Sequence, residues 1–422
     1  MSRPAAAAPG TPASSRARAL SVPAWFAGSA CLGCTVVATW AAIRAGDSLV
    51  PENGPASIRW NWLFLGALVG AFLAYLGGLG LLAAAGRSRL ALVLALAAAV
   101  QLFPLAAPVV LTTDPYTYWD YGRLSAVHGA NPYETTPSAF PSDPAYEHMG
   151  SRWYDTTSAY GPAFTLLSEG HAAVAGESVE LAGWLYKALA AASVLALVAL
   201  AARLSARPAF AAAFVGWNPL LAVHFAGGGH NDALMMALFV GGLALAASGR
   251  RGLAGAAWAL SVAVKWVTLV LLPLQLLAAR ASRRAIPSVG LAVALAALAA
   301  LASWRYGAAW LEAAGPLTDN LETRSRVSLP SRLVQLTGVS GEVFAAAGLA
   351  AFAVLYAWLL VQAWRGRARF ALAAGGMLLT TAWLLPWYAV WAVPLAAIEE
   401  DRTARWLALG LSAYLLPAYV PL

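Results

Sequence analysis

Long apolar runs separated by short arginine clusters constrain the fold of this chain more than any other feature. The runs at 22–43, 61–85 and 179–202 each reach the roughly 20 residues that an α-helix needs to cross a bilayer. Hydrophobic residues make up 60% of the chain and charged residues 11%, whereas a soluble domain carries about 25% charged residues. The sequence therefore predicts an all-α, polytopic membrane protein and excludes an ordinary soluble domain.

The arginines predict how the runs are oriented. The clusters lie between alternate runs, at 87–89, 203–207, 250–251, 280–284 and 365–369. By the positive-inside rule these loops are cytoplasmic, so the net charge of +8 reflects membrane topology rather than a nucleic-acid-binding face.

The first residues differ in composition from the rest of the chain. Residues 1–21 are rich in Ala, Pro and Ser, which predicts a disordered cytoplasmic tail before an integral membrane domain at 22–422. The first apolar run is too long for the hydrophobic core of a signal peptide and favours a retained span.

Two regions are predicted to be hairpins of short helices. The clusters at 250–251 and 280–284 share a side, so the 28 residues between them must go out and return. Each arm is then only about 20 Å long, short of a full crossing. The same holds for 370–398, hinged at Pro386. With these hairpins the chain has about 13 transmembrane helices, and the loops 111–178 and 304–341 are extracytoplasmic.

The densest polar motif begins where the apolar run at 90–110 ends. Residues 111–123 hold two carboxylates, four aromatic side chains and one arginine. Polar groups at the edge of the hydrocarbon are costly, so this cluster predicts a functional site. Asp114 followed by Pro115 also fits a helix N-cap and first helical residue, so capping is an alternative role for these two residues.

Two further motifs fall on the same predicted face. Between two spans, three glycines lead into His230, Asn231 and Asp232; a capped turn would explain the glycines and Asp232 but not the other two. Lys265 lies at the tip of the first hairpin and could hold a phosphate, although snorkelling near a helix end would also explain it.

The loop 304–341 contributes more cations. Arg324 and Arg326 depart from the positive-inside trend, which makes them candidates for binding an anion; local ion pairs in a solvated loop are the alternative. Metal coordination is a competing chemistry, but no His/Cys spacing predicts zinc. A divalent ion held by oxygen ligands remains open. We assign no metal and no cofactor.

Several motifs together resemble a known family. Asp114-Pro115-Tyr116, Tyr121-Gly122-Arg123, Gly-Ala-Asn-Pro-Tyr at 129–133 and Tyr160-Gly161-Pro162 resemble the first outer loop of polyprenyl-phosphate-mannose-dependent mannosyltransferases. These are membrane glycosyltransferases of the GT-C type, and the α-1,6-mannosyltransferase branch is the most similar. The 229–232 motif, the Lys265 hairpin and Pro386-Trp387-Tyr388 resemble that family's later motifs. Residues 1–85 carry none of this resemblance.

The resemblance implies an enzyme of the bacterial inner membrane. It would transfer a hexose, mannose in the first place, from a polyprenyl-phosphate donor to a glycan or glycolipid acceptor at the extracytoplasmic face. Asp114 matches the base of a direct, inverting displacement. Candidates for binding the donor phosphate are Lys265, His230, Arg324 and Arg326. Candidates for binding the sugar or the acceptor are Tyr116, Tyr118, Asp120, Tyr121, Arg123, Asn131, Tyr133, Tyr160, Asn231 and Asp232.

A different class of function fits the short, broken helices. In transporters and lipid flippases such helices flank ionisable groups near the bilayer midplane, and the two halves are related. Here the ionisable groups gather at one predicted face and no internal repeat is visible, which favours the enzyme.

Overall fold

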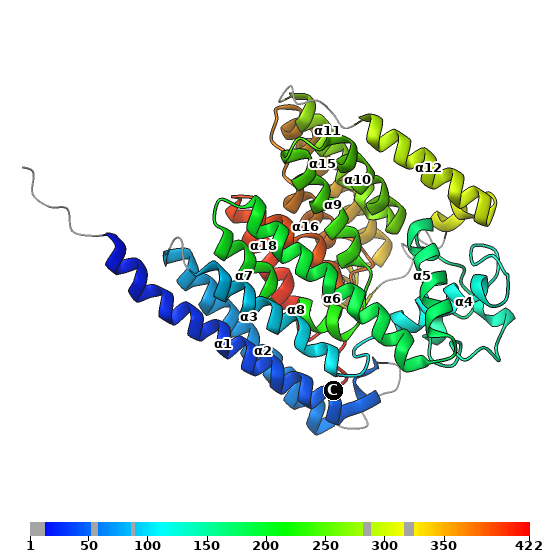
Figure 1. Cartoon of the computed structure of the whole chain (residues 1–422), viewed down its shortest axis with the longest axis horizontal. Coiled ribbons are helices and arrows are strands. Elements are labelled where there is room, and N and C mark those ends of the chain that lie inside the picture. Colours follow the sequence, from blue (N-terminus) through cyan, green and yellow to red (C-terminus); the bar gives the residue numbers. More distant parts are fainter. Residues whose placement is uncertain (1–12, 52–57, 86–88, 282–287, 316–324) are drawn as a thin grey trace, which may run out of the picture.

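A computed structural model describes residues 13–51, 58–85, 89–281, 288–315 and 325–422 (Figure 1). All regular elements in these ranges are helical, as predicted. The α-helices are α1 (Ala13–Ala45), α2 (Ile58–Ala85), α3 (Leu90–Leu102), α4 (Asp114–Ala126), α5 (Pro162–Ala175), α6 (Val179–Leu204), α7 (Pro208–Gly216), α8 (Pro219–Ala222), α9 (Asp232–Ala247), α10 (Arg251–Val264), α11 (Leu272–Ala281), α12 (Ser288–Tyr306), α14 (Leu329–Thr337), α15 (Gly341–Trp364), α16 (Phe370–Thr380), α17 (Val393–Ile398) and α18 (Arg402–Leu415). Arg324 and the first twelve residues of the predicted tail lie outside the described ranges.

The longest helices match the apolar runs. Five described segments are long and apolar enough to cross a membrane, at Ala24–Leu49, Ile58–Ala84, Val179–Leu204, Val289–Tyr306 and Gly341–Trp364. A sixth span would be formed by α7 together with Pro219–Gly227, which meet at a 49° bend. The remaining apolar helices have 10–17 residues. The total of about 13 transmembrane helices remains a prediction, because it counts these shorter helices as crossing.

The helices of both predicted hairpin regions are interrupted, the first at Lys265 and the second between Thr380 and Pro386. α10 ends at Val264, Lys265 is extended with φ −155°, and a 3₁₀ turn, η7 (Trp266–Val270), leads into α11. A Cβ on Gly290 near the start of α12 would lie 2.3 Å from the carbonyl oxygen of Gly252 near the start of α10, so the chain leaves one end of the bundle and returns to it. In the second region α16 ends at Thr380, and η9 (Pro386–Trp391) precedes α17.

The arginine-bearing helix ends lie together. Arg203 at the end of α6 donates to Ser248 after α9 at 3.1 Å, and Arg207 donates to the carbonyl of Leu82 near the end of α2 at 3.2 Å. Arg280 at the end of α11 stacks over Trp364 at the end of α15, 5.1 Å from the ring centre. The polar loops that hold the candidate residues connect the opposite ends of these helices, so the bundle separates the arginine clusters from the candidate residues.

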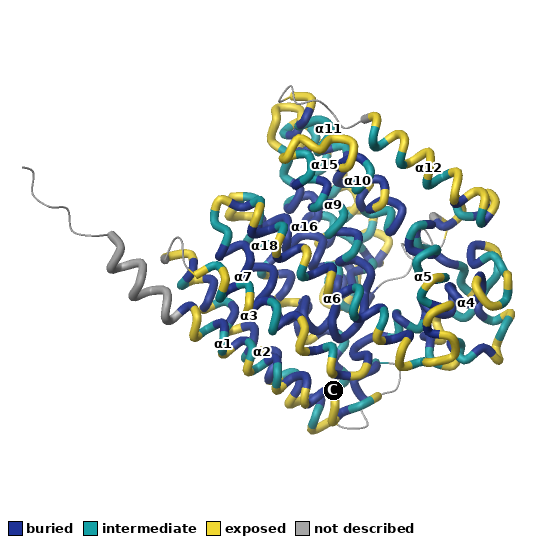
Figure 2. Tube along the Cα trace, in the orientation of Figure 1, coloured by how far each residue is buried: buried dark blue, intermediate teal, exposed yellow. Residues whose placement is uncertain are grey.

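Two helices leave most of their apolar surface uncovered. Only 11% of the apolar window of α12 and 6% of that of α15 is buried, and Val293, Leu349 and Val354 are exposed (Figure 2). Apolar surface of this extent fits contact with lipid, where it would have no hydrophobic cost.

Candidate functional site

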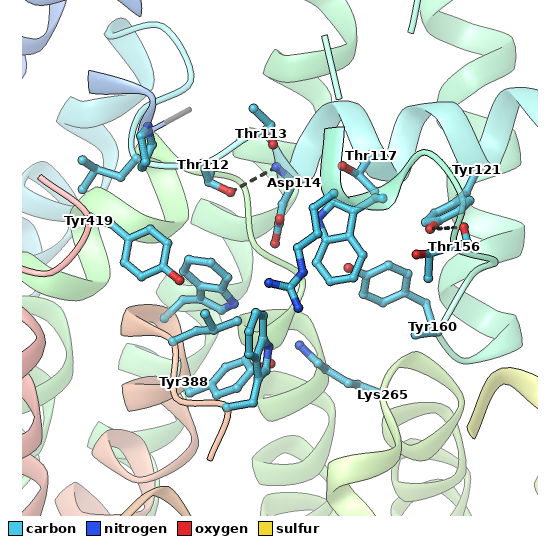
Figure 3. A pocket seen from close by; sticks show the side chains of 18 of the residues that line it. Thr112, Thr113, Asp114, Thr117, Tyr121, Thr156, Tyr160, Lys265, Tyr388 and Tyr419 are labelled. Carbon is cyan, nitrogen blue, oxygen red and sulfur yellow. Dashed lines mark hydrogen bonds between the residues drawn. The ribbon is translucent and has the colours of Figure 1, made fainter. Parts of the chain in front are cut away.

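A cavity of about 250 Å³ lies among the loops at the end of the bundle opposite the arginines. Its walls come from residues 111–121, residues 152–160, Lys265 and residues 383–388, together with Pro51 and Tyr419. In Figure 3 the side chains of Asp114, Lys265 and Tyr388 point into the same space. Segments more than 250 residues apart in sequence therefore form one polar site.

Asp114 is held by side chains and does not cap its own helix. Thr113 is the N-cap residue of α4, and Asp114 is the first helical residue. Its Oδ2 accepts hydrogen bonds from Tyr118 Oη and from His230 Nδ1, each at 3.1 Å. The capping alternative is therefore wrong for Asp114. Within the described residues, Oδ1 receives no hydrogen bond from a protein group, so this oxygen remains free to accept one from a ligand.

The surroundings of Asp114 favour its charged form. Burial acts to raise the pKa of this carboxyl, but the hydrogen bond from His230 and its electrostatic attraction, with Lys265 and Tyr118, outweigh burial and lower the pKa below its ordinary value. Asp114 is consequently ionised at neutral pH, which is the state that a general base requires.

A glycine turn brings His230 to Asp114. Gly229 has φ +72°, and a Cβ there would lie 2.9 Å from Cγ of Pro115, so the turn accepts only glycine without strain. The ring of His230 then stacks on Trp387 with ring centres 3.6 Å apart and an interplanar angle of 13°. His230, predicted as a phosphate ligand, is instead held against the carboxylate.

Lys265 forms an ion pair that was not predicted. Its Nζ lies 2.8 Å from Oδ1 of Asp232, which also accepts a 2.7 Å hydrogen bond from Trp391 Nε1. The ammonium lies 5.0 Å from the ring centre of Tyr388, which is cation–π distance. Lys265 nevertheless lines the cavity, as predicted from its place at the hairpin tip.

Close backbone contact brings the long first loop to this hairpin. A Cβ on Gly161 would lie 2.2 Å from the carbonyl oxygen of Ala263, and the Gly161 amide donates to the carbonyl of Val264 at 3.2 Å. Tyr160 and Lys265 are thereby placed on one wall.

Two basic residues at the site were not among the predicted ones. Arg152 lines the cavity, and its guanidinium lies 4.3 Å from the ring centre of Trp383; it has no carboxylate partner in the part of the chain that the structure describes. Arg152 departs from the positive-inside trend just as Arg326 does, so the same reasoning could have found it. Lys187 on α6 is buried and donates to the carbonyls of Leu105 (3.2 Å), Ala107 and Pro108, which fixes the segment before Asp114.

Some predicted residues support the site from behind the cavity. Tyr121 lines the cavity and donates to the carbonyl of Thr156 at 2.8 Å (Figure 3). Tyr118 lies buried behind Asp114, and its ring packs edge-on against Tyr160, with centres 5.0 Å apart. Asn231 is buried beside His230 and makes no side-chain hydrogen bond to a described residue.

Other predicted residues lie elsewhere. Tyr133 donates to or accepts from Thr165 at 2.8 Å, and Asn131 donates to the carbonyl of Tyr306 at 2.9 Å, so both fasten the loop. Tyr116 packs near His148, with ring centres 5.6 Å apart. Arg326 is exposed and does not line the cavity.

Arg123 forms its ion pair with Asp143 rather than with Asp120 on the same helix. Arg123 Nε lies 2.7 Å from Asp143 Oδ1, and its Nη1 donates to the carbonyl of Gly176. Asp143 also lies 2.6 Å from His128. Burial and the charge of Asp143, partly offset by Arg123, raise the pKa of Asp120 to about 7.

In the ranges with described coordinates, no group of three or more His, Cys, Asp or Glu side chains has a geometry suited to a metal ion. The fold and site together define an all-helical membrane protein with a carboxylate and two cations around one cavity at the helix ends.

Comparison with known proteins gives the family. Residues 23–282 match the model for the alpha-(1->6)-mannopyranosyltransferase N-terminal domain, and residues 328–422 match the MptB C-terminal domain. The chain therefore belongs to the alpha-(1->6)-mannopyranosyltransferase family. The match begins at residue 23, so the family likeness also covers α1 and α2, where the motifs had shown none.

Individual relatives are more distant. A probable alpha-(1->6)-mannopyranosyltransferase of Mycolicibacterium smegmatis is 28% identical over 359 residues, covering 69% of this chain and 62% of the relative. Alpha-(1->6)-mannopyranosyltransferase A of Mycobacterium tuberculosis is 26% identical over 424 residues, covering 89% and 81%. The protein of that name from Corynebacterium glutamicum is 32% identical over 173 residues, 40% of this chain and 34% of the relative. No solved structure matches the chain significantly.

Proposed function

We propose that this protein is a mannosyltransferase that uses a polyprenyl-phosphate mannose donor and a glycan or glycolipid acceptor. The reaction takes place at the extracytoplasmic face of the bacterial inner membrane. The observation that carries the proposal is Asp114, an ionised carboxylate with one oxygen fixed by two hydrogen bonds and the other open to a cavity that holds cations.

Asp114 has the place and charge state of a general base. An acceptor hydroxyl donates to Oδ1, its oxygen attacks the anomeric carbon, and the bond from that carbon to the phosphate oxygen breaks. The proton goes to Asp114 and the electron pair goes to the departing lipid phosphate. A single displacement inverts the anomeric centre. Tyr118 and His230 hold the carboxylate in one orientation, which favours the proton transfer.

The departing phosphate gains a second negative charge, and preorganised cations that face it would stabilise the transition state. Lys265 and Arg152 supply these cations. Asp232 already neutralises Lys265 in part, whereas Arg152 forms no ion pair with any described carboxylate. Arg152 thus offers the larger uncompensated charge to an incoming anion, and it is a further candidate for phosphate binding beside Arg324 and Arg326.

The remaining walls suit a sugar ring. Tyr160, Trp387 and Tyr388 present flat apolar faces with polar edges to the cavity. A cavity of about 250 Å³ is smaller than the roughly 300–1,000 Å³ of drug-sized ligand sites, which favours one sugar residue over a longer glycan. The position of the charged groups at the helix ends also supports an enzyme over a transporter.

The decisive experiment compares Asp114→Asn with wild type in membranes supplied with polyprenyl-phosphate mannose and an α-mannoside acceptor. Asparagine keeps the size of the side chain and an oxygen for Tyr118 but does not take up the proton. We expect a loss of roughly 10²–10⁴ in rate with little change in thermal stability.

Glu147→Gln is the matched control, because the Glu147 side chain is 77% exposed and does not line the cavity. It should transfer mannose at the wild-type rate. Normal transfer by Asp114→Asn would remove Asp114 as the base, and no transfer by wild type with this donor would overturn the proposed reaction.

A further inference from the structure

Behind Asp114 lies a cluster of buried polar side chains without protein partners. Of sixteen such buried atoms in the described residues, six fall between residues 224 and 232. They are both ring nitrogens of His224, Nε2 of His230, both amide atoms of Asn231, and Oδ2 of Asp232. All four residues are at most 2% exposed. Packing of two helices does not require six unpartnered buried polar atoms within nine residues.

The local backbone creates this cluster. Residues Val223–Gly227 form a π-helical turn, η6, and the glycine turn that follows it leads into α9. Single π-turns often occur at functional sites. Here the turn places the His224 ring 5.9 Å from that of His230, centre to centre, and 5.8 Å from that of Trp387.

The two nitrogens of His230 have different tasks. An ionised carboxylate only accepts hydrogen bonds, so Nδ1, 3.1 Å from Asp114 Oδ2, must carry the proton. In a neutral ring Nε2 is then an acceptor. It lies beside Gly228, where a Cβ would be 3.1 Å from Nε2 and 2.7 Å from the carbonyl oxygen of His224. Stacking on Trp387 prevents the ring from turning to satisfy Nε2 elsewhere. Which nitrogen of an imidazole is protonated depends on the hydrogen bond that the other one makes.

We propose that ordered water bridges His224, Asn231 and Nε2 of His230, and that these water hydrogen bonds hold His230 in the tautomer that donates to Asp114. Water is the occupant that fits: internal waters typically make about three hydrogen bonds to buried polar groups that otherwise lack partners. It donates to Nε2, so the proton stays on Nδ1. His224 and Asn231 are thus positioning residues that act through His230 on the proposed base. This inference rests on the proposed function.

The consequence is a defined pH response. Three groups favour the ionised form of Asp114: His230 from the glycine turn, Lys265 from the hairpin and Tyr118 from its own helix. Other ionisable groups near it are the phenols of Tyr121, Tyr160 and Tyr388 and the carboxylate of Asp232, and Arg152 and Tyr419 line the same cavity. If His230 loses this tautomer, Asp114 loses the largest contribution that lowers its pKa, so the pKa rises. The acidic limb of the rate profile must then move to higher pH.

The test is His224→Phe in the full-length protein, assayed for kcat/KM against pH with polyprenyl-phosphate mannose. Phenylalanine keeps the ring and removes both unpartnered nitrogens. We expect kcat/KM to fall about tenfold at acidic pH and the acidic limb to move up by about one pH unit. The melting temperature should stay or rise, because buried groups without partners are removed.

His171→Phe is the matched control, because Nδ1 of His171 is also buried without a described partner but lies on α5, away from the cluster. It should leave the pH profile unchanged. A wild-type profile in His224→Phe overturns the proposal. If that variant does not fold, Asn231→Leu takes its place with the same two outcomes.

A second test, which repeats the His224→Phe change in a His230→Asn variant, separates control of the His230 tautomer from an effect of packing alone. His230→Asn puts an amide N–H where Nδ1 was, and an amide has no tautomer to be fixed. Adding His224→Phe to His230→Asn should therefore have no further effect on the pH profile. An equal shift in both backgrounds overturns the proposal. Because each comparison needs only measurable mannose transfer by the parent protein, failure of the inference is distinct from failure of the proposed function.

Discussion

At the scale of single residues, the ion pair between Asp232 and Lys265 complicates mutation of Lys265 as a test of phosphate binding. Removing one partner of a buried pair leaves the other charge uncompensated and destabilises the fold by about 3–5 kcal/mol. Asp232 is fully buried and the Lys265 side chain is 15% exposed, so Lys265→Met loses stability as well as a phosphate contact. Replacing Arg152 should not reduce stability in this way, because Arg152 is exposed and forms no ion pair with a described residue.

Arg152→Gln is therefore the cleaner test of phosphate binding. Losing one charge-assisted contact of about 1.5–3 kcal/mol should lower kcat/KM for the lipid-phosphate donor by roughly 10- to 150-fold. The melting temperature should not change. Arg326→Gln is the control, since Arg326 is exposed and outside the cavity, and it should behave as wild type. The reverse pattern would return the phosphate site to the loop 325–341.

Asp120 predicts a pH dependence of stability. Its pKa is raised to about 7 by burial and by Asp143, so the folded protein binds a proton more tightly than the unfolded chain. Stability from this group is fully present below about pH 4 and is lost as pH rises toward 7. Asp120→Asn should remove this dependence. At pH 8 its free energy of unfolding should exceed that of wild type by up to about 4 kcal/mol, so the variant should melt at a higher temperature.

The measurement is thermal unfolding of both proteins at pH 5 and pH 8. The difference between them should be larger at pH 8. An equal difference at both values would mean that Asp120 is already ionised at pH 5.

At the scale of elements, the glycine contacts decide whether the first loop reaches the hairpin. A Cβ on Gly161 would be 2.2 Å from a carbonyl oxygen of α10, which is far inside contact distance. Gly161→Ala should push residues 152–160 away from Lys265, cost about 1–3 kcal/mol of stability and reduce transfer at least tenfold. Gly170 on α5 is the matched control, because a Cβ there meets nothing within 4 Å. Gly170→Ala should stabilise its helix slightly and leave transfer unchanged.

The elements themselves were largely predictable from the sequence. The apolar run at 179–202 coincides with α6, and the break at Lys265 falls between α10 and η7, because proline, glycine and isolated charges interrupt apolar runs. Asp114, His230, Lys265 and Tyr160 were expected at one face, and they converge at the cavity or directly behind it.

The partners of these residues were not predictable. Arg123 pairs with Asp143, 20 residues further along the chain, and Arg152 reaches Trp383 across more than 200 residues of sequence. These contacts depend on the path of long loops. That path is set by backbone hydrogen bonds such as Ser325 to Ala382 at 3.0 Å, which no local sequence pattern encodes.

At the scale of the whole molecule, the separation of charge predicts orientation in the membrane. Arginines gather at one end of the helices and the cavity at the other, so the positive-inside rule puts the cavity outside. In a variant with Cys31 and Cys34 replaced by alanine, single cysteines at Ser142 and Gln335 should react with an impermeant thiol reagent in intact cells. A cysteine at Ser248 should react only after the cells are opened; all three positions are exposed on the protein surface. Labelling of Ser248→Cys alone in intact cells would invert the topology, and the site would then face the cytoplasm, where a donor carried in the outer leaflet does not reach it.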